Sequence, residues 1–213
     1  MIIKKIASKL YDYFVKVKKT HEFKKANKHN FLSLKAENYR TININKIHCG
    51  KHSYGTLFID AYGDSKEGLT IGSYCSISGS VKFILGGNHS STHLLSYPFK
   101  AMEKGENEAF SKGPIVVKDD VWIANNVIIL SGVTIGQGAI VGAGTVISQN
   151  IPPYSVVCGN PAKIVKKRFS DPIIEKLLLC DLSDLSTISR GILYENITLD
   201  NIDDIIAVLP HKK

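Results

Sequence analysis

Aliphatic side chains recur every six residues through the second half of this chain, with another core-sized residue four positions after each. An α-helix has a period of about 3.6 residues and a strand a period of 2.0, so neither explains this spacing. Six-residue repeats are typical of a parallel β-helix, in which three short faces form a coil of about 18 residues. The first set is Val117, Ile123, Ile129, Ile135, Val141 and Ile147, and the second is Val121, Val127, Val133, Ala139, Thr145 and Ile151.

The repeat also has an earlier part and one interruption. Residues 71–82 hold two more repeats, and the spacing stops between Leu85 and Pro114. A long aperiodic segment inside a compact repeat is usually a functional loop. His89 stands near the start of this loop, where a neutral imidazole could remove a proton from a hydroxyl at physiological pH. An ordinary solvent-exposed histidine is the alternative interpretation.

Positive charge is concentrated at the N-terminus. Residues 1–30 carry nine lysines against two acidic residues, and the remainder carries 18 basic and 17 acidic residues. The nearly neutral body argues against nucleic-acid binding through a basic face. The apolar residues of this segment follow a helical spacing, which predicts an amphipathic basic helix. Residues 1–20 are therefore suited to peripheral contact with a membrane surface, and packing of the helix within an oligomer is the alternative.

These patterns divide the chain into three parts. We expect a basic amphipathic helix and linker at 1–30, a β-helix domain at 31–165 with an inserted loop at 86–113, and a helical tail at 166–213. The four cysteines have no paired spacing, which favours reduced thiols in a cytoplasmic protein. The inner membrane surface is a second expected location if the basic helix binds lipid.

Several short motifs occur in order along the chain, at residues 53–55, 69–77, 86–89, 96–99, 120–123 and 159–163. Taken together, they resemble the hexapeptide acyltransferases, and within them the xenobiotic acetyltransferase branch with its polysaccharide O-acetyltransferase relatives. This resemblance implies an all-β fold with helical ends, namely a left-handed parallel β-helix with an inserted loop and a C-terminal helical tail. It also implies a homotrimer with an acetyl-CoA site at each subunit interface. His89 would be the general base for direct transfer in a ternary complex.

The resemblance further assigns a cofactor track, while position alone suggests the acceptor contacts. Two departures are Ala124, where many relatives have glycine, and Gln149, where many have lysine. No metal is expected. The implied cofactor-binding residues are Trp122, Ala124, Asn125, Gly142, Ala143, Ser148, Lys163 and Lys166. The acceptor contacts expected from position are Tyr54, Asp60, Tyr62 and Tyr97.

The expected activity is acetyl-CoA-dependent O-acetylation of a sugar in cell-surface polysaccharide (O-antigen or capsule) biosynthesis. The tail lacks the tryptophan-rich pattern of antibiotic-modifying members, which favours a sugar hydroxyl as acceptor. An antibiotic O-acetyltransferase of the chloramphenicol or streptogramin type is the main alternative, and an amine acceptor also stays open. A zinc enzyme on the same prism would need interface histidines, and residues 115–160 contain none. A non-catalytic trimeric scaffold is the remaining alternative.

Overall fold

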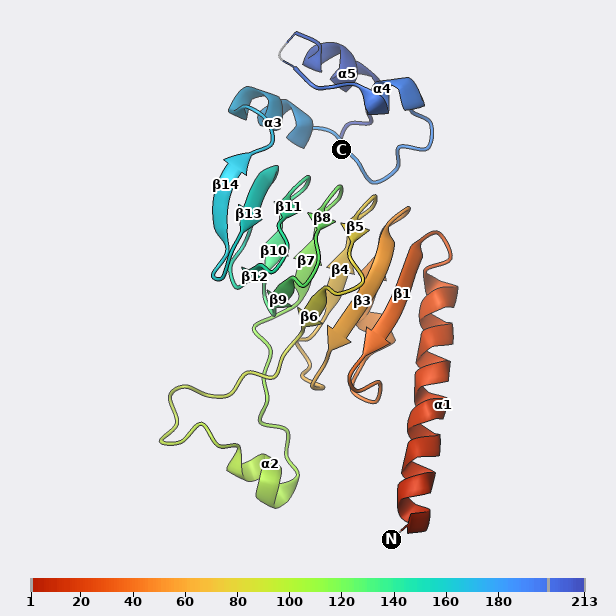
Figure 1. The fold of residues 1–213 in the computed structure, drawn as a ribbon, viewed down its shortest axis with the longest axis vertical. Helices are drawn as coiled ribbons and strands as arrows, with labels where there is room; N and C mark the ends of the chain where they lie inside the picture. The colour runs from red at the N-terminus through yellow and green to blue at the C-terminus, as the bar shows by residue number, and fades with distance from the viewer. Residues whose placement is uncertain (1, 199, 213) are drawn as a thin grey trace.

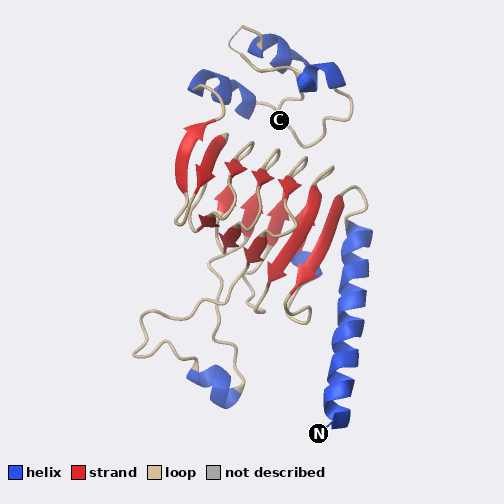
Figure 2. Cartoon of the chain, viewed as in Figure 1, coloured by secondary structure: helices blue, strands red, loops and turns tan. Residues whose placement is uncertain are grey.

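The protein consists of an N-terminal helix, a prism of short strands and a helical tail (Figure 1, Figure 2). The computed structural model describes residues 2–198 and 200–212. The helices are α1 (Ile2–Ala26), α2 (Phe99–Lys104), α3 (Asp171–Leu178), α4 (Arg190–Tyr194) and α5 (Ile202–Val208), with a 3-10 turn at Ile44–Lys46. The strands are β1 (Phe31–Ala36), β2 (Ile47–Cys49), β3 (Tyr54–Asp60), β4 (Leu69–Ile71), β5 (Ser76–Ile77), β6 (Lys82–Ile84), β7 (Ile115–Val117), β8 (Trp122–Ile123), β9 (Ile128–Leu130), β10 (Thr134–Ile135), β11 (Ile140–Val141), β12 (Val146–Ile147), β13 (Ser155–Cys158) and β14 (Lys163–Lys167).

The strand register confirms the predicted coil of 18 residues. Parallel pairing joins Val117 to Ile135, Ile123 to Val141 and Ile129 to Ile147, each 18 positions apart. All six of these side chains are fully buried. Each inward aliphatic of this kind contributes roughly 1.5–3 kcal/mol when it is removed from water. The six-residue spacing is therefore the core of a parallel β-helix.

The pairings define three faces and three edges, which locate every candidate site residue. Face 1 contains β2, β4, β7 and β10, face 2 contains β5, β8, β11 and β13, and face 3 contains β6, β9 and β12. Strand β3 runs through two faces, because its start pairs with β5 and its end with β6. We call the edge between faces 3 and 1 the loop edge, that between faces 1 and 2 the tail edge, and that between faces 2 and 3 the open edge.

The edges carry a second six-residue period that lies in the backbone. Residues at the turns have φ angles in the left-handed region, which glycine, asparagine and aspartate tolerate best. Between residues 120 and 144, three of these positions are glycine and two are short polar residues, whereas other tail-edge turns have His52, Tyr74 and Tyr154 in this region. The five residues between 120 and 144 are Asp120 (φ 56°), Asn126 (φ 58°), Gly132 (φ 81°), Gly138 (φ 69°) and Gly144 (φ 71°).

Each end of the prism is covered by helix. At the N-terminal end, α1 lies beside β1 (Figure 1), and Phe23 from its last turns is fully buried in the core. Beyond the last coil, β14 pairs antiparallel with β13 and leads into α3. Helix α3 buries Ile173, Ile174 and Leu177 in a cluster with Tyr154. Ser170 precedes α3, but its side chain makes no capping hydrogen bond.

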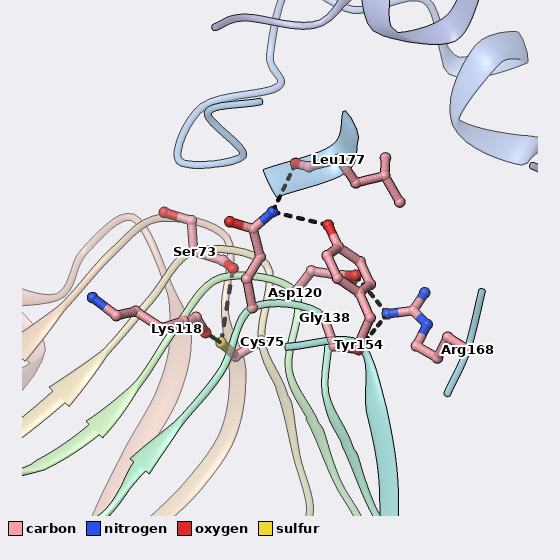
Figure 3. Close-up of polar contacts among 9 residues, drawn as sticks. Ser73, Cys75, Lys118, Asp120, Gly138, Tyr154, Arg168 and Leu177 are labelled. Atoms are coloured by element: carbon pink, nitrogen blue, oxygen red, sulfur yellow. Dashed lines mark hydrogen bonds and ion pairs between the residues drawn. The ribbon is translucent and has the colours of Figure 1, made fainter. Parts of the chain in front are cut away.

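Polar contacts join the tail edge to the tail (Figure 3). The Arg168 guanidinium donates to Asp120 Oδ2 at 2.8 Å and to the Gly138 carbonyl at 2.7 Å. The Gln137 amide donates to the Tyr154 hydroxyl at 2.8 Å and to the Leu177 carbonyl at 3.3 Å. The Gln137 bonds satisfy buried polar groups, and the Arg168 bonds are partly exposed, where the tail turns back over the prism.

Candidate active site

The imidazole of His89 is oriented by a backbone carbonyl. Its Nδ1 lies 2.8 Å from the carbonyl oxygen of Ser96, seven residues further along the loop. A carbonyl oxygen can only accept, so Nδ1 carries the proton and a neutral ring has its lone pair on Nε2. This arrangement gives the exposed His89 side chain the tautomer that a general base requires.

The base of the loop is fixed to the prism. Asn88 and Phe110 form an antiparallel bridge, with N–H to carbonyl distances of 3.1 and 3.0 Å. The Asn88 amide also donates to the Phe110 carbonyl at 2.9 Å and to the Ser131 hydroxyl at 3.3 Å. His89 therefore emerges from a rigid stem, whereas the remainder of the loop, with α2, extends away from the prism (Figure 1).

The hollow beside His89 is small. Its volume is about 30 Å³, which is room for about one water molecule. Typical ligand pockets measure roughly 300–1,000 Å³, so the loop alone does not enclose an acceptor. The hollow is lined by His89, Ser90, His93, Leu95, Ser96, Tyr97, Pro98 and Glu108.

Tyr62 lies at the same edge and covers the backbone leading to His89. A Cβ atom at Gly87 would lie 2.7 Å from Tyr62 Cζ, so only glycine lets the ring approach this closely. The buried carboxylate of Glu67 accepts the Tyr62 and Gly63 N–H groups at 2.8 and 3.1 Å. Glu67 was not among the predicted site residues, because nothing in the local sequence indicates that it supports Tyr62.

The Asp60 carboxylate forms an ion pair with Lys82. Its Oδ2 lies 2.8 Å from Lys82 Nζ, and the Asp60 side chain is only 9% exposed. The hydrogen bond to Asp60 raises the pKa of Lys82. Among the described residues, the buried Oδ1 of Asp60 has no partner. Asp60 is thus better suited to holding β3 against β6 than to contacting an acceptor.

The predicted cofactor residues lie mainly along the open edge. Ala124 and Gly142 occupy equivalent positions in successive coils, and their N–H groups donate to the carbonyls of Val141 and Val157 at 3.0 and 2.8 Å. These amides are therefore not free to bind a ligand. Asn125 and Ala143 occupy the next equivalent pair of positions and are exposed.

One predicted lysine, Lys163, lies at the far end of this edge, and the other, Lys166, lies beside face 2. In β14, Lys163 pairs with Cys158 and Lys166 with Val156, and both lysines are exposed. A Cβ atom at Gly142 would lie 3.0 Å from Cys158 Cβ, so Lys163 continues the column of Ala124 and Gly142. Small side chains followed by an ammonium group form a shallow strip that suits a flexible chain ending in phosphate.

The remaining predicted residues lie elsewhere on the prism. Trp122 and Tyr54 share the outer side of face 2 through their pairing with Ser76, and they are 53% and 54% exposed. Ser148 follows β12 at the loop edge and is exposed.

The candidate residues thus form two groups on different edges. His89, Tyr62, Tyr97 and Asp60 belong to the loop edge, whereas Ala124, Asn125, Gly142, Ala143 and Lys163 follow the open edge. Face 3 separates the two edges within one chain. A single copy does not bring the base and the cofactor strip together.

A larger hollow of about 320 Å³ lies far from His89, under the tail. Its lining is mainly apolar and includes Tyr154, Phe169 and Leu177. It is a gap between two packed parts of the chain and contains none of the predicted site residues. Within residues 2–198 and 200–212, no group of three or more His, Cys, Asp or Glu side chains is arranged to hold a metal ion.

Comparison with known proteins agrees with the six-residue repeat of the prism. A model of the bacterial transferase hexapeptide (six repeats) matches residues 114–149. The chain is 38% identical over 154 residues to the virginiamycin A acetyltransferase of Staphylococcus aureus, covering 65% of this chain and 70% of that protein. These repeats define a hexapeptide-repeat protein, and the chain belongs to the hexapeptide-repeat acyltransferase family.

The chain is also similar to two further proteins, one in sequence and one in fold. The chain is 44% identical over 118 residues to a probable macrolide acetyltransferase of Lysinibacillus sphaericus, covering 52% of this chain and 66% of that protein. It spans less than two thirds of that protein's length. A solved hexapeptide-repeat acetyltransferase of Vibrio cholerae superposes with a TM-score of 0.55 at 24% identity, covering 75% of this chain and 90% of that one. This second likeness concerns the fold alone.

Proposed function

We propose that this protein transfers an acetyl group from acetyl-CoA to a hydroxyl of a sugar in cell-surface polysaccharide biosynthesis. The observation that carries the proposal is the contact between His89 Nδ1 and the Ser96 carbonyl. With Nδ1 protonated, Nε2 can take the proton of an acceptor hydroxyl as its oxygen attacks the thioester carbonyl. The hydroxyl oxygen forms the ester, the thioester C–S bond breaks, and the proton ends on the CoA thiolate.

Homologous acetyltransferases support acetyl-CoA as the donor. The solved Vibrio cholerae protein has also been crystallised with acetyl-CoA. In this chain the pantetheine arm would follow Ala124, Asn125, Gly142 and Ala143 along the open edge, whereas Ser148, at the loop edge, could contact it only across an interface. Lys163 and Lys166 would face the phosphates. Since the Ala124 and Gly142 N–H groups are bonded between coils, their small side chains, rather than their amides, make room for the arm.

The assembly we propose is a homotrimer of left-handed β-helices with the active sites between copies. Two observations support it. His89 and the cofactor strip lie on different edges of one prism, and the hollow at His89 has only about 30 Å³. The open edge of a neighbouring copy, placed against the loop, would enlarge the hollow at His89 and bring a cofactor strip beside the base. Trp122, Tyr54 and Val165, all at least half exposed on one copy, would then be covered.

Polar side chains around His89 are compatible with a sugar that approaches it from outside the small hollow. Six of the eight residues that line the hollow are polar and can form hydrogen bonds to hydroxyl groups. Tyr62 and Tyr97 stand nearest to contact the acceptor, whereas Tyr54 could contact it only across an interface. Such a protein would act in the cytoplasm, near the inner membrane surface where polysaccharide precursors are assembled.

Antibiotic O-acetylation is the second candidate, favoured by the 38–44% identity to virginiamycin and macrolide acetyltransferases. The two candidates differ in the acceptor that supports release of free CoA. We expect thiol release from acetyl-CoA with an O-antigen or capsule oligosaccharide, and none above background with chloramphenicol or a streptogramin. The opposite pattern selects the antibiotic function. No release with either class, in a protein that binds CoA, contradicts both.

A further inference from the structure

Helix α1 attaches to the prism through a largely polar face. Arg40 donates to Asp12 Oδ1 at 2.5 Å and to the Ser8 hydroxyl at 3.1 Å. Lys19 donates to the carbonyl of Ile42, and Phe23 inserts into the core. These contacts are four, seven and four residues apart along α1, so they lie on one side of the helix.

A different side of α1 is apolar and faces solvent. At about 100° per residue, its members are centred roughly 150° around the helix from the docking contacts. None of the five is covered by another described part of the chain to more than about half of its surface. They are Ile6 (54% exposed), Leu10 (54%), Tyr13 (62%), Phe14 (65%) and Val17 (48%).

Lysines border this apolar stripe on both sides. The same helical geometry places two lysines along one border and two along the other, and all four are exposed. Such side chains lay their methylene stems on an apolar surface and keep the ammonium group in water. The first pair is Lys9 and Lys16, and the second is Lys18 and Lys25, whereas Lys4 and Lys5 lie nearer the docking contacts.

We propose that α1 binds a bilayer that contains anionic phospholipid, with the stripe in the head-group region and the lysines on lipid phosphates. The charge pattern selects this occupant over a second copy of α1. Two copies packed along the stripe would bring their lysine borders together, which like-charge repulsion opposes, whereas an anionic surface neutralises them. No described helix is long and apolar enough to cross a membrane, so the contact is peripheral. The proposal does not depend on the catalytic assignment.

Co-sedimentation of the full chain with vesicles tests it. With phosphatidylglycerol–phosphatidylcholine vesicles at about 0.1 M salt, we expect partition at least about tenfold stronger than with phosphatidylcholine alone. The difference should largely disappear at about 1 M salt, where the Debye length falls to about 3 Å.

The Leu10→Glu/Phe14→Glu double variant should lose vesicle binding by about tenfold or more, because it places charge in the apolar stripe. Leu179→Glu is the matched control: Leu179 is 61% exposed but lies at the end of α3, and this variant should bind as the parent does. Equal binding to both lipids, or equal binding by all variants, would overturn the proposal. So would light scattering that shows the double variant folded but with fewer subunits than the parent, since copies of the chain would then cover the stripe.

Discussion

The loop edge and the tail edge belong to the same repeat, but side chains are buried at the tail edge and the key side chain is exposed at the loop edge. At the tail edge, Tyr154 is 2% exposed and Arg168 bonds to two successive coils. At the loop edge, His89 is exposed, and one bond to the Ser96 carbonyl orients its ring. The repeat therefore provides the same backbone support at both edges. What each edge does depends on the segment that the chain adds there.

The sharpest test of this contrast is His89→Ala. Loss of the general base should reduce acetyl transfer by about 10²–10⁴-fold, measured as thiol release from acetyl-CoA. The free energy of unfolding should stay within about 0.5 kcal/mol of the parent, because the side chain is exposed. His48→Ala, an exposed histidine on face 1, serves as the control and should retain activity. Near-normal turnover in His89→Ala would show that His89 is not the general base.

The next largest effect is expected from alanine at Gly138. The residue has φ 69°, and an added Cβ would overlap the Tyr154 ring at the tail edge. Left-handed strain and overpacking cost about 1–3 kcal/mol each, so chemical denaturation should show a loss of about 3 kcal/mol or more. Gly144→Ala provides the matched control, since its φ is 71° and a Cβ there meets nothing within 4 Å. It should cost only about 1 kcal/mol. Equal losses would mean that the tail is loosely packed.

Arg168→Ala should have a smaller effect on the same edge. It removes two charge-assisted hydrogen bonds, and the side chains of Arg168 and Asp120 are 26% and 42% exposed. Partial exposure reduces the effect, so we expect a loss of about 1–2 kcal/mol in urea unfolding. Lys176→Ala breaks another tail ion pair, to Asp203, whose side chains are 39% and 76% exposed. That control should lose less than about 1 kcal/mol. A larger loss for Lys176→Ala than for Arg168→Ala would contradict the role given to the tail edge.

The coil could be predicted from the sequence because burial imposes one residue class at one spacing. Val117 and Ile135 have to be aliphatic, and their separation gives the register directly. The corner positions were harder to find, since Asp120 and Gly138 share a backbone conformation but no side-chain chemistry. The path of the tail was not predictable, because contacts such as Arg168 to Asp120 join residues 48 positions apart.

The site was predictable only in part. His89 could be proposed from its place in the interruption, but nothing in the sequence identifies Ser96 as the residue whose carbonyl orients its ring. Glu67 was missed because its carboxylate acts on the N–H groups of Tyr62 and Gly63, which any sequence would provide. The separation of the acceptor and cofactor residues follows from which face each strand occupies, and a linear motif does not contain that information.

The loss of stability at alkaline pH tests whether Tyr154 is buried at the tail edge, and it is the smallest effect expected. Burial raises the pKa of Tyr154 from 10.0 to about 12. A group whose pKa is raised on folding contributes its full stability below the unfolded pKa, and this contribution is lost as pH rises from 10 towards 12. By linkage, the loss attributable to Tyr154 between pH 8 and pH 11 is on the order of 1 kcal/mol. Burial also raises the pKa of the Cys75 thiol to about 12, so the parent and Tyr154→Phe will both weaken. The difference between their denaturation curves isolates the contribution of the Tyr154 hydroxyl.

Tyr154→Phe should be less stable than the parent at pH 8, because Gln137 loses a hydrogen-bond partner. It should lose less stability than the parent between pH 8 and pH 11. Parallel curves would show that the Tyr154 hydroxyl reaches water and that the tail does not close this edge.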